Sequence, residues 1–449
     1  MEKVSLKTAL GIVSVALVAF AGIMAETAMN VTFPTLTQVF GTELNVIQWV
    51  TTAYLLAVTV MVTTSAYLTK KFSSRKLWLM SVFIFMVGTL IAGFASNITV
   101  LLIGRVLEGI AAGIAMPLVF NVVMATIPRS KIGVWMGFAA LVISLAPSFG
   151  PTYGGILVDT LGWRAIFFIA LLAPMLSLIL GWRTVVDIER QQLTKKFDLV
   201  AFSLLSIFLI LTLLVVNQLE KGNVNWMFVV IIIIALVAFI WRGKSSNQSF
   251  LNLRLFTEIK FVTLLVPIAL YMFVLLGFNL IIPTFLQEVL HTSSFWAGFS
   301  LLPGSIIGAL LNPVFGRLYD LNGAKIPLYM GNWIFIVVIL IMSLWTKQMA
   351  LISIILLYIG FIVGRNMAFT GAQTAALVDV SVSEKTDATA IIQTAQMFMG
   401  ALGTTVGALL QSKMGETSGF QTFGYLSVII AMIIFGLIFL HFHTHKTTV

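Results

Sequence analysis

The stretch LGIVSVALVAFAGIMAETAMNVTF (Leu10–Phe33) decides the fold class, because this apolar run is long enough to cross a lipid bilayer as one helix. Near its end the run carries a carboxylate, Glu26. A charged side chain at the centre of a membrane helix costs roughly 2.5–3.5 kcal/mol on insertion scales. Such residues usually face a protein interior or a water-filled cavity and mark the path of an ion or substrate. The alternative is a protonated, hydrogen-bonded Glu26 that serves packing alone.

The composition extends this interpretation to the whole chain. Of its 449 residues, 59% are hydrophobic and 9% are charged, whereas a soluble domain carries about 25% charged residues. Only helices and closed barrels span lipid, and long unbroken apolar runs favour helices over the short alternating segments of a barrel. The chain has no cysteine, which excludes disulfides, thiolate catalysis and Cys-ligated metal sites. We therefore predict an all-α polytopic membrane protein.

Apolar runs of spanning length recur fourteen times along the chain. They cover residues 10–33, 46–69, 77–96, 98–125, 132–157, 164–182, 198–218, 225–242, 262–286, 295–318, 327–345, 349–375, 388–411 and 421–442. The fourth run follows the third after only Ser96 and Asn97. An even number of spans places both termini on one side of the membrane.

The distribution of basic residues indicates which side that is. The segments on the side of the termini hold 20 Lys and Arg residues, and those on the opposite side hold 4. Cytoplasmic loops are enriched in Lys and Arg, so we predict a multi-pass protein of the cytoplasmic (plasma) membrane with both termini in the cytoplasm. The net charge of +10 follows from this topology, and we expect no nucleic-acid partner.

Two similar basic loops indicate an internal repeat. LTKKFSSRK (68–76) follows the second run and GRLYDLNGAK (316–325) follows the tenth. We therefore predict two parallel six-helix bundles, residues 1–190 and 251–449, with two linker helices inserted in residues 191–250. This plan is common among transporters, in which the substrate site lies near the midplane of the membrane.

Several motifs resemble those of the major facilitator superfamily. LIGRVLEG (102–109) resembles the helix-4 motif with a buried arginine, and GPTYGG (150–155) resembles the antiporter motif GPxxGG, carried by Gly150, Pro151, Gly154 and Gly155. Other stretches are similar to the fourteen-helix drug:proton antiporters of that superfamily: GWRAIFF (162–168), FDLV (197–200), LRLF (253–256) and AGFSLLPG (297–304). The resemblance covers nearly the whole chain and implies the major-facilitator fold with 14 transmembrane helices.

The resemblance also assigns a gating role to the two basic loops. In the family, an acid and a basic residue of these loops are thought to latch the two halves together. This chain has Ala66, Lys70 and Ser73 where the first loop usually carries Gly, Asp and Gly, while the second loop keeps its acid. The gating residues implied here are Lys70, Arg75, Arg317 and Asp320. In helix 1 Glu26 takes the place of the family's Asp, and in helix 4 Glu108 replaces a Gln.

Four charges lie well inside the predicted spans, away from the span ends: Glu26, Arg105, Glu108 and Arg365. A rise of about 1.5 Å per residue places Glu26 about 10 Å and Glu108 about 15 Å below the outer membrane boundary, so the two acids lie at similar depth. Arg105 and Glu108 share one face of a helix. Glu26 has no charged neighbour in its own helix, so we assign it reversible protonation, with Arg105 and Glu108 as the other proton-coupling residues. The alternative for Arg105 and Glu108 is a purely structural pair.

The predicted substrate-binding residues are Glu26, Asn30, Asn279, Arg365 and Asn366. Arg365 lies deep within its span and would favour an anionic or zwitterionic group, unless backbone carbonyls or a helix end partner it. The amides would add hydrogen bonds, although helix–helix contact is an alternative for each of them. The tryptophans near span ends are expected in an interfacial belt: Trp49, Trp135, Trp163, Trp226 and Trp345.

These features predict a proton-coupled antiporter that exports lipophilic, cationic or zwitterionic drugs by alternating access. Its partners would be a small-molecule substrate, H⁺ and the lipid bilayer, with no cofactor or metal, because the proton gradient drives transport; we expect a monomer. The alternatives are an antiporter for an inorganic cation such as Na⁺, an exporter of a lipid-like metabolite and a membrane-embedded enzyme. Against the enzyme, the chain has no GxxxxGK[ST] or HExxH motif.

Overall fold

A computed structural model describes residues 4–42, 44–47, 49–128, 132–187, 197–220, 222, 224–245, 250–378, 380–381 and 384–444. The chain divides by its contacts into two compact units. Unit 1 comprises Met1–Phe197, Gln248–Phe250 and Ser294–Phe299, and unit 2 comprises Asp198–Asn247, Leu251–Ser293 and Ser300–Val449.

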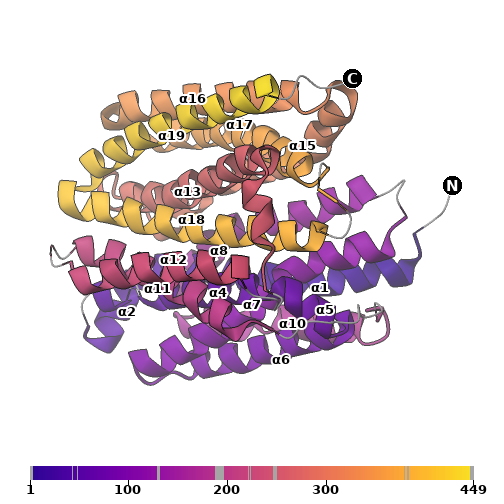
Figure 1. Ribbon diagram of the computed structural model, residues 1–449. Coiled ribbons are helices and arrows are strands. Elements are labelled where there is room, and N and C mark those ends of the chain that lie inside the picture. Colours follow the sequence, from indigo (N-terminus) through magenta and orange to yellow (C-terminus); the bar gives the residue numbers. More distant parts are fainter. Residues whose placement is uncertain are drawn as a thin grey trace. The chain divides into compact units, whose positions relative to one another are not determined.

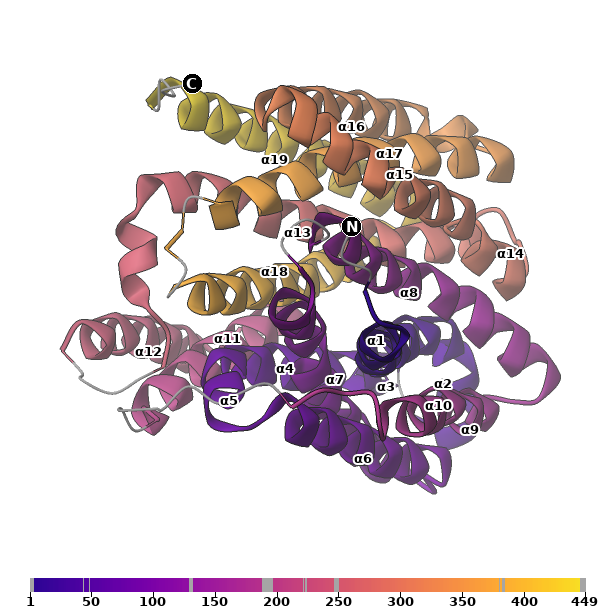
Figure 2. The same cartoon turned by 90° about the vertical axis from the view of Figure 1, so that its right-hand side faces the viewer.

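Unit 1 is built around the first helix, which contacts α7, α8 and α10 (Figure 2). Its other helices complete a bundle in which α7 also packs against α4 and α6. The helices of unit 1 are α1 (Leu6–Ala28), η1 (Met29–Thr32), α2 (Phe33–Phe40), α3 (Leu44–Ile47), α4 (Trp49–Thr63), α5 (Ser65–Lys71), α6 (Ser74–Gly93), α7 (Ile98–Thr126), α8 (Ile132–Thr160), α9 (Arg164–Ala170), α10 (Leu172–Gly181) and α14 (Ser294–Phe299).

Unit 2 is built around α13, which packs against α17, α18 and α19. The helices α16, α17 and α19 lie side by side in both views (Figures 1 and 2). The helices of unit 2 are α11 (Leu199–Glu220), α12 (Trp226–Ser245), η3 (Leu253–Thr257), α13 (Ile259–Glu288), α15 (Leu302–Asn322), α16 (Lys325–Trp345), η4 (Thr346–Gln348), α17 (Leu351–Val378), α18 (Lys385–Met414) and α19 (Glu416–Thr444). The two inserted helices therefore group with the C-terminal bundle, since α11 packs against α18.

The helices coincide with the predicted spans. Among the described residues, 12 helices are long and apolar enough to cross a membrane, and the number is 13 if α4 and α5, which are bent by 53°, count as one span. Helix α18 occupies the place of the predicted run 388–411 but is not among them. The helix is long enough to span, but it is less apolar than the other spans because it contains polar side chains. These are the buried residues Thr389, Gln393, Thr394 and Gln396.

The short boundary between the third and fourth runs is explained by a helix cap. Helix α6 ends at Gly93, and the side chain of Asn97 accepts a hydrogen bond of 3.0 Å from the backbone N–H of Val100 at the start of α7. Asparagine is a favoured N-cap because its side chain satisfies one of the free N–H groups of the first turn. One polar residue thus separates two spans that hydrophobicity alone nearly merges.

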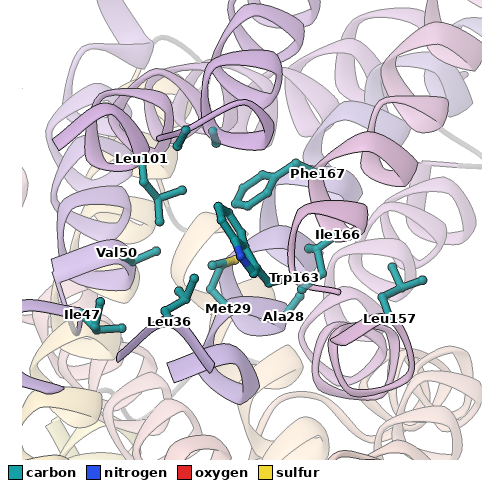
Figure 3. Close-up of a cluster of buried hydrophobic side chains, with 12 residues drawn as sticks. Ala28, Met29, Leu36, Ile47, Val50, Leu101, Leu157, Trp163, Ile166 and Phe167 are labelled. Atoms are coloured by element: carbon teal, nitrogen blue, oxygen red, sulfur yellow. The ribbon is translucent and has the colours of Figure 1, made fainter. Parts of the chain in front are cut away.

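An apolar cluster fills unit 1 where α1 ends (Figure 3). Its buried members are Ala28, Met29, Leu36, Ile47, Val50, Ala92, Ala95, Leu101, Leu157, Trp163, Ile166 and Phe167. Trp163 is only 4% exposed and lies among these side chains, so its expected place in an interfacial belt is wrong. The indole packs edge-on against the rings of Phe40 and Phe167, whose centres lie 5.6 and 6.1 Å away, and such contacts favour burial of the aromatic side chain. Trp226 and Trp345 are exposed, at 74% and 62%.

Candidate functional site

A buried ion pair lies on α7, next to the apolar cluster. Arg105 and Glu108 are both fully buried, and the Arg105 Nη1 donates to Glu108 Oε2 at 2.6 Å. The Arg105 Nε donates to the backbone carbonyl of Val50 at 3.1 Å, and Thr89 donates to Glu108 Oε1 at 2.8 Å. Breaking such a pair leaves an uncompensated buried charge. The Arg105 Nη2 nevertheless has no hydrogen-bond partner within the described part of the chain.

Glu26 lies on α1 within the electrostatic reach of this pair. Its side chain is 6% exposed and interacts with the charge of Arg105. Among the described residues no group donates a hydrogen bond to Glu26 and none forms an ion pair with it. One turn further on, Asn30 is fixed, because Thr51 donates to its Oδ1 at 3.1 Å. A buried carboxyl without a fixed partner is free to exchange ligands, which the paired Glu108 is not.

Tyr54 on α4 joins this group of charges and was missed in the sequence. Its side chain is fully buried, and its hydroxyl has no hydrogen-bond partner among the described residues. The hydroxyl lies 3.1 Å from the position of a Cβ on Gly22, one turn before Glu26. The Arg105 guanidinium carbon lies over the Tyr54 ring, 4.4 Å from the ring centre. Tyr54 also interacts electrostatically with Glu26, Arg105 and Glu108. The only signal in the sequence was a tyrosine inside a span, and that signal is weak.

Tyr54→Phe is expected to stabilise the fold and to impair transport. An orphaned buried hydroxyl costs about 1–3 kcal/mol, so its removal raises the melting temperature in detergent. The export rate is expected to fall severalfold, because the hydroxyl that interacts with Glu26, Arg105 and Glu108 is lost. Tyr271→Phe is the matched control, since the Tyr271 hydroxyl donates to Asn332 Oδ1 at 2.7 Å and its loss lowers the melting temperature. A Tyr54→Phe protein with unchanged export would show that the hydroxyl has no part in coupling.

The GPxxGG residues of α8 hold α1 at the level of Glu26. A Cβ on Gly150 would collide with Thr27 Oγ1 and lie 2.6 Å from the carbonyl oxygen of Met24. A Cβ on Gly154 would lie 2.5 Å from the carbonyl oxygen of Ala28. Small residues let two membrane helices approach this closely. Pro151 and Gly155 are also buried in α8. The motif therefore fixes the backbone on both sides of the carboxylate.

Gly150→Ala is expected to lower the stability of unit 1 by about 1–3 kcal/mol, because a methyl group is forced against a backbone that cannot yield. The measurement is thermal unfolding of the purified protein in detergent. Gly137→Ala, in the same helix, is the control: its Cβ meets nothing within 4 Å, and alanine is the better helix former by about 1 kcal/mol. Equal shifts in the two variants would contradict this account of the motif.

The predicted gating residues lie in different environments. Arg75 donates to the carbonyl of Trp182 at 2.8 Å, at the end of α10. A cation at a helix C-terminus satisfies free carbonyls and the helix dipole. Lys70 is half-buried at the end of α5, and Arg317 and Asp320 are exposed on α15. The latch role of these four residues stays a prediction.

A further loop contact was not foreseen. Asn252 Nδ2 donates to Glu384 Oε1 at 2.8 Å, and Ser381 donates to Glu384 Oε2 at 2.7 Å. The hydrogen bond from Ser381, with those of Asn252 and the charge of Arg254, holds the pKa of Glu384 below its ordinary value. The carboxylate thus ties the segment before α13 to the segment before α18.

The predicted substrate residues of unit 2 lie on α17 and on the neighbouring α13. Arg365 is 5% exposed, and its Nη1 donates to Asn366 Oδ1 at 3.0 Å. Asn279 on α13 accepts a hydrogen bond of 2.7 Å from the Tyr358 hydroxyl. Asn279 and Asn366 are both buried. The structure thus places all three within unit 2, and Glu26 and Asn30 within unit 1.

Together the helices and the buried charges define a polytopic membrane transporter. Residues 15–404 match the family model of the Major Facilitator Superfamily. The lincomycin resistance protein LmrB of Bacillus subtilis is 31% identical over 407 residues, 89% of this chain and 85% of that protein. LmrB of Listeria monocytogenes is 30% identical over 408 residues, 89% of this chain and 86% of that protein.

The fold has relatives among solved structures. A POT family transporter in complex with a thioalcohol conjugated peptide aligns with a TM-score of 0.72 over 95% of each chain, at 13% identity.

The chain belongs to the major facilitator superfamily. This confirms the membership expected from the motifs, including its fourteen-helix drug:proton antiporter family, and the all-α fold. The protein is a multi-pass membrane transporter related to drug-resistance exporters, and it is not an enzyme.

Proposed function

We propose that this protein is a proton-coupled antiporter that exports lipophilic drugs with a cationic or zwitterionic character across the cytoplasmic membrane by alternating access. The observation that carries the proposal is the buried Glu26 carboxyl, 6% exposed and without a hydrogen bond among the described residues. A charge at such a position is expensive and is usually functional. The names of the related resistance proteins support a drug as the substrate.

Competition for one carboxylate gives exchange. A proton that enters from outside neutralises Glu26 and weakens its attraction for a cationic substrate, which then leaves outward while the proton continues inward. The Arg105–Glu108 pair keeps its own hydrogen bonds and sets the electrostatic field at Glu26. Each unit has further proposed substrate contacts: Asn30 in unit 1, and Asn279, Arg365 and Asn366 in unit 2. The excess of basic residues on one side supports a plasma-membrane location with both termini in the cytoplasm.

Everted membrane vesicles test the proposal. Vesicles that contain the protein are acidified inside by respiration, and a pH-sensitive dye reports the gradient. Addition of a cationic dye or a quinolone zwitterion is expected to collapse the gradient, because substrate enters as protons leave. Vesicles without the protein are the control. A response to Na⁺ alone would replace drug export with cation exchange, and no response to any of the three would overturn the proposal.

A further inference from the structure

Arg365 is a buried cation without an acidic partner. It lies near the middle of α17, about 21 Å from the first residue of the helix at about 1.5 Å per residue, and is 5% exposed. The charged or titratable groups that interact with it are the hydroxyls of Tyr358 and Tyr271. Among the described residues no carboxylate forms an ion pair with it. A guanidinium remains charged in proteins, so this positive charge has no acid to compensate it within the described part of unit 2.

The guanidinium is held in place while much of its hydrogen-bonding capacity remains unused. It lies 3.8 Å from the ring centre of Phe369, one turn along α17. Its Nη1 donates to Asn366 Oδ1 at 3.0 Å and its Nη2 to the Met272 sulfur at 2.8 Å. A thioether is a weak acceptor. The Nε–H is buried and has no partner within the described residues.

Neither a described backbone carbonyl nor a lipid head group supplies the missing partner. No backbone carbonyl of the described residues accepts a hydrogen bond from Arg365, so the interpretation that backbone carbonyls partner this arginine fails within them. Phospholipid head groups lie at the membrane surface, about 15 Å from the centre of the hydrocarbon core, while Arg365 lies at mid-helix. An anion that enters the protein would supply the missing partner.

The geometry of the free edge selects the class of anion. A guanidinium presents parallel N–H groups that match the two oxygens of a carboxylate. The second nitrogen of this edge, Nη2, would exchange only its weak hydrogen bond to the Met272 sulfur for one to the carboxylate. We propose that Arg365 binds the carboxylate of the transported substrate through its Nε edge, so that zwitterionic drugs are preferred over their cationic esters. This rests on the proposed export function.

A fluoroquinolone and its methyl ester test the proposal, because the two differ only in the carboxylate. Wild-type protein is expected to bind and export the acid better than the ester at neutral pH. Arg365→Gln is expected to lower the affinity for the acid at least about tenfold, the loss of a charged hydrogen bond, and to leave the ester unchanged. Arg365→Lys keeps the charge without the planar fork and falls between the two. Lys325→Gln, which removes an exposed charge of the same unit, is expected to alter neither.

Equilibrium dialysis of the purified protein separates this proposal from the proposed function. Equal affinity of the wild type for acid and ester overturns the role of Arg365 without any variant. The role is also overturned if Arg365→Gln lowers the affinities for acid and ester equally while Arg365→Lys leaves both unchanged. If the protein distinguishes acid from ester in dialysis but substrate does not collapse the pH gradient in vesicles, the carboxylate site is supported and the proposed proton coupling is overturned.

Discussion

Glu26→Gln is expected to abolish the proposed proton-coupled export in everted vesicles, while the protein remains folded. Glutamine has the same size and is neutral, so burial at a position that is 6% exposed becomes cheaper, not more costly. The amide side chain can neither bind a proton near neutral pH nor attract a cation with a full negative charge. The loss of one charged hydrogen bond corresponds to about 1.5–3 kcal/mol, or about a ten- to hundredfold lower affinity for a cationic substrate. Collapse of the pH gradient then falls to the level of vesicles without the protein.

Two further variants sharpen this expectation. Glu26→Asp keeps the charge on a side chain one methylene shorter and retains part of the coupled export. Glu288→Gln removes an exposed carboxylate at the end of α13 and leaves export unchanged. Wild-type coupling in Glu26→Gln would move the proton site elsewhere and would leave Glu26 as a packing residue.

Arg105→Gln is expected to destabilise the protein by about 3–5 kcal/mol, because it leaves the Glu108 carboxylate buried without its cation. The carbonyl of Val50 also loses its donor. Thermal unfolding of the detergent-purified protein measures the loss, and the yield of monodisperse protein falls with it. A stability close to the wild type would show that water or a rearranged donor already compensates Glu108.

The double variant Arg105→Met, Glu108→Leu decides whether the pair is more than structural. Apolar side chains of similar volume often replace a buried ion pair without loss of stability, so most of the stability returns. If stability returns but export is still lost, the charges of the pair are needed for transport itself. If export returns as well, the pair serves only to fix α7, which is the alternative that the sequence left open.

The spans were predictable because hydrophobicity is a local property. A run of about 20 apolar residues becomes a helix in lipid whatever surrounds it, since every backbone polar group must be satisfied within the segment. The exception, α18, is a full helix with buried Thr and Gln side chains. The i,i+3 spacing of Arg105 and Glu108 and the similar depth of Glu26 were likewise matters of counting along helices.

The partners of these residues were not predictable. Tyr54 looked like any aromatic residue of a span until the packing of α4 against α7 set its hydroxyl among the buried charges. Trp163 lay at a span end in the sequence, yet the neighbouring helices enclose it. From the sequence, a structural role and a ligand-binding role for Arg365 were equally plausible. Only the side chains around α17 show that no described acidic residue pairs with it.

The sequence by itself determined the class of this protein: a chain of membrane helices with one carboxylate in its first span and the motifs of its family. Those properties follow from the local chemistry of short stretches. The tertiary structure decided which side of each helix faces which neighbour, and hence that Glu108 is paired while Glu26 has no fixed partner and Arg365 no acid among the described residues. Helix rotation depends on the fit of side chains from distant segments, and no single stretch of sequence contains that information.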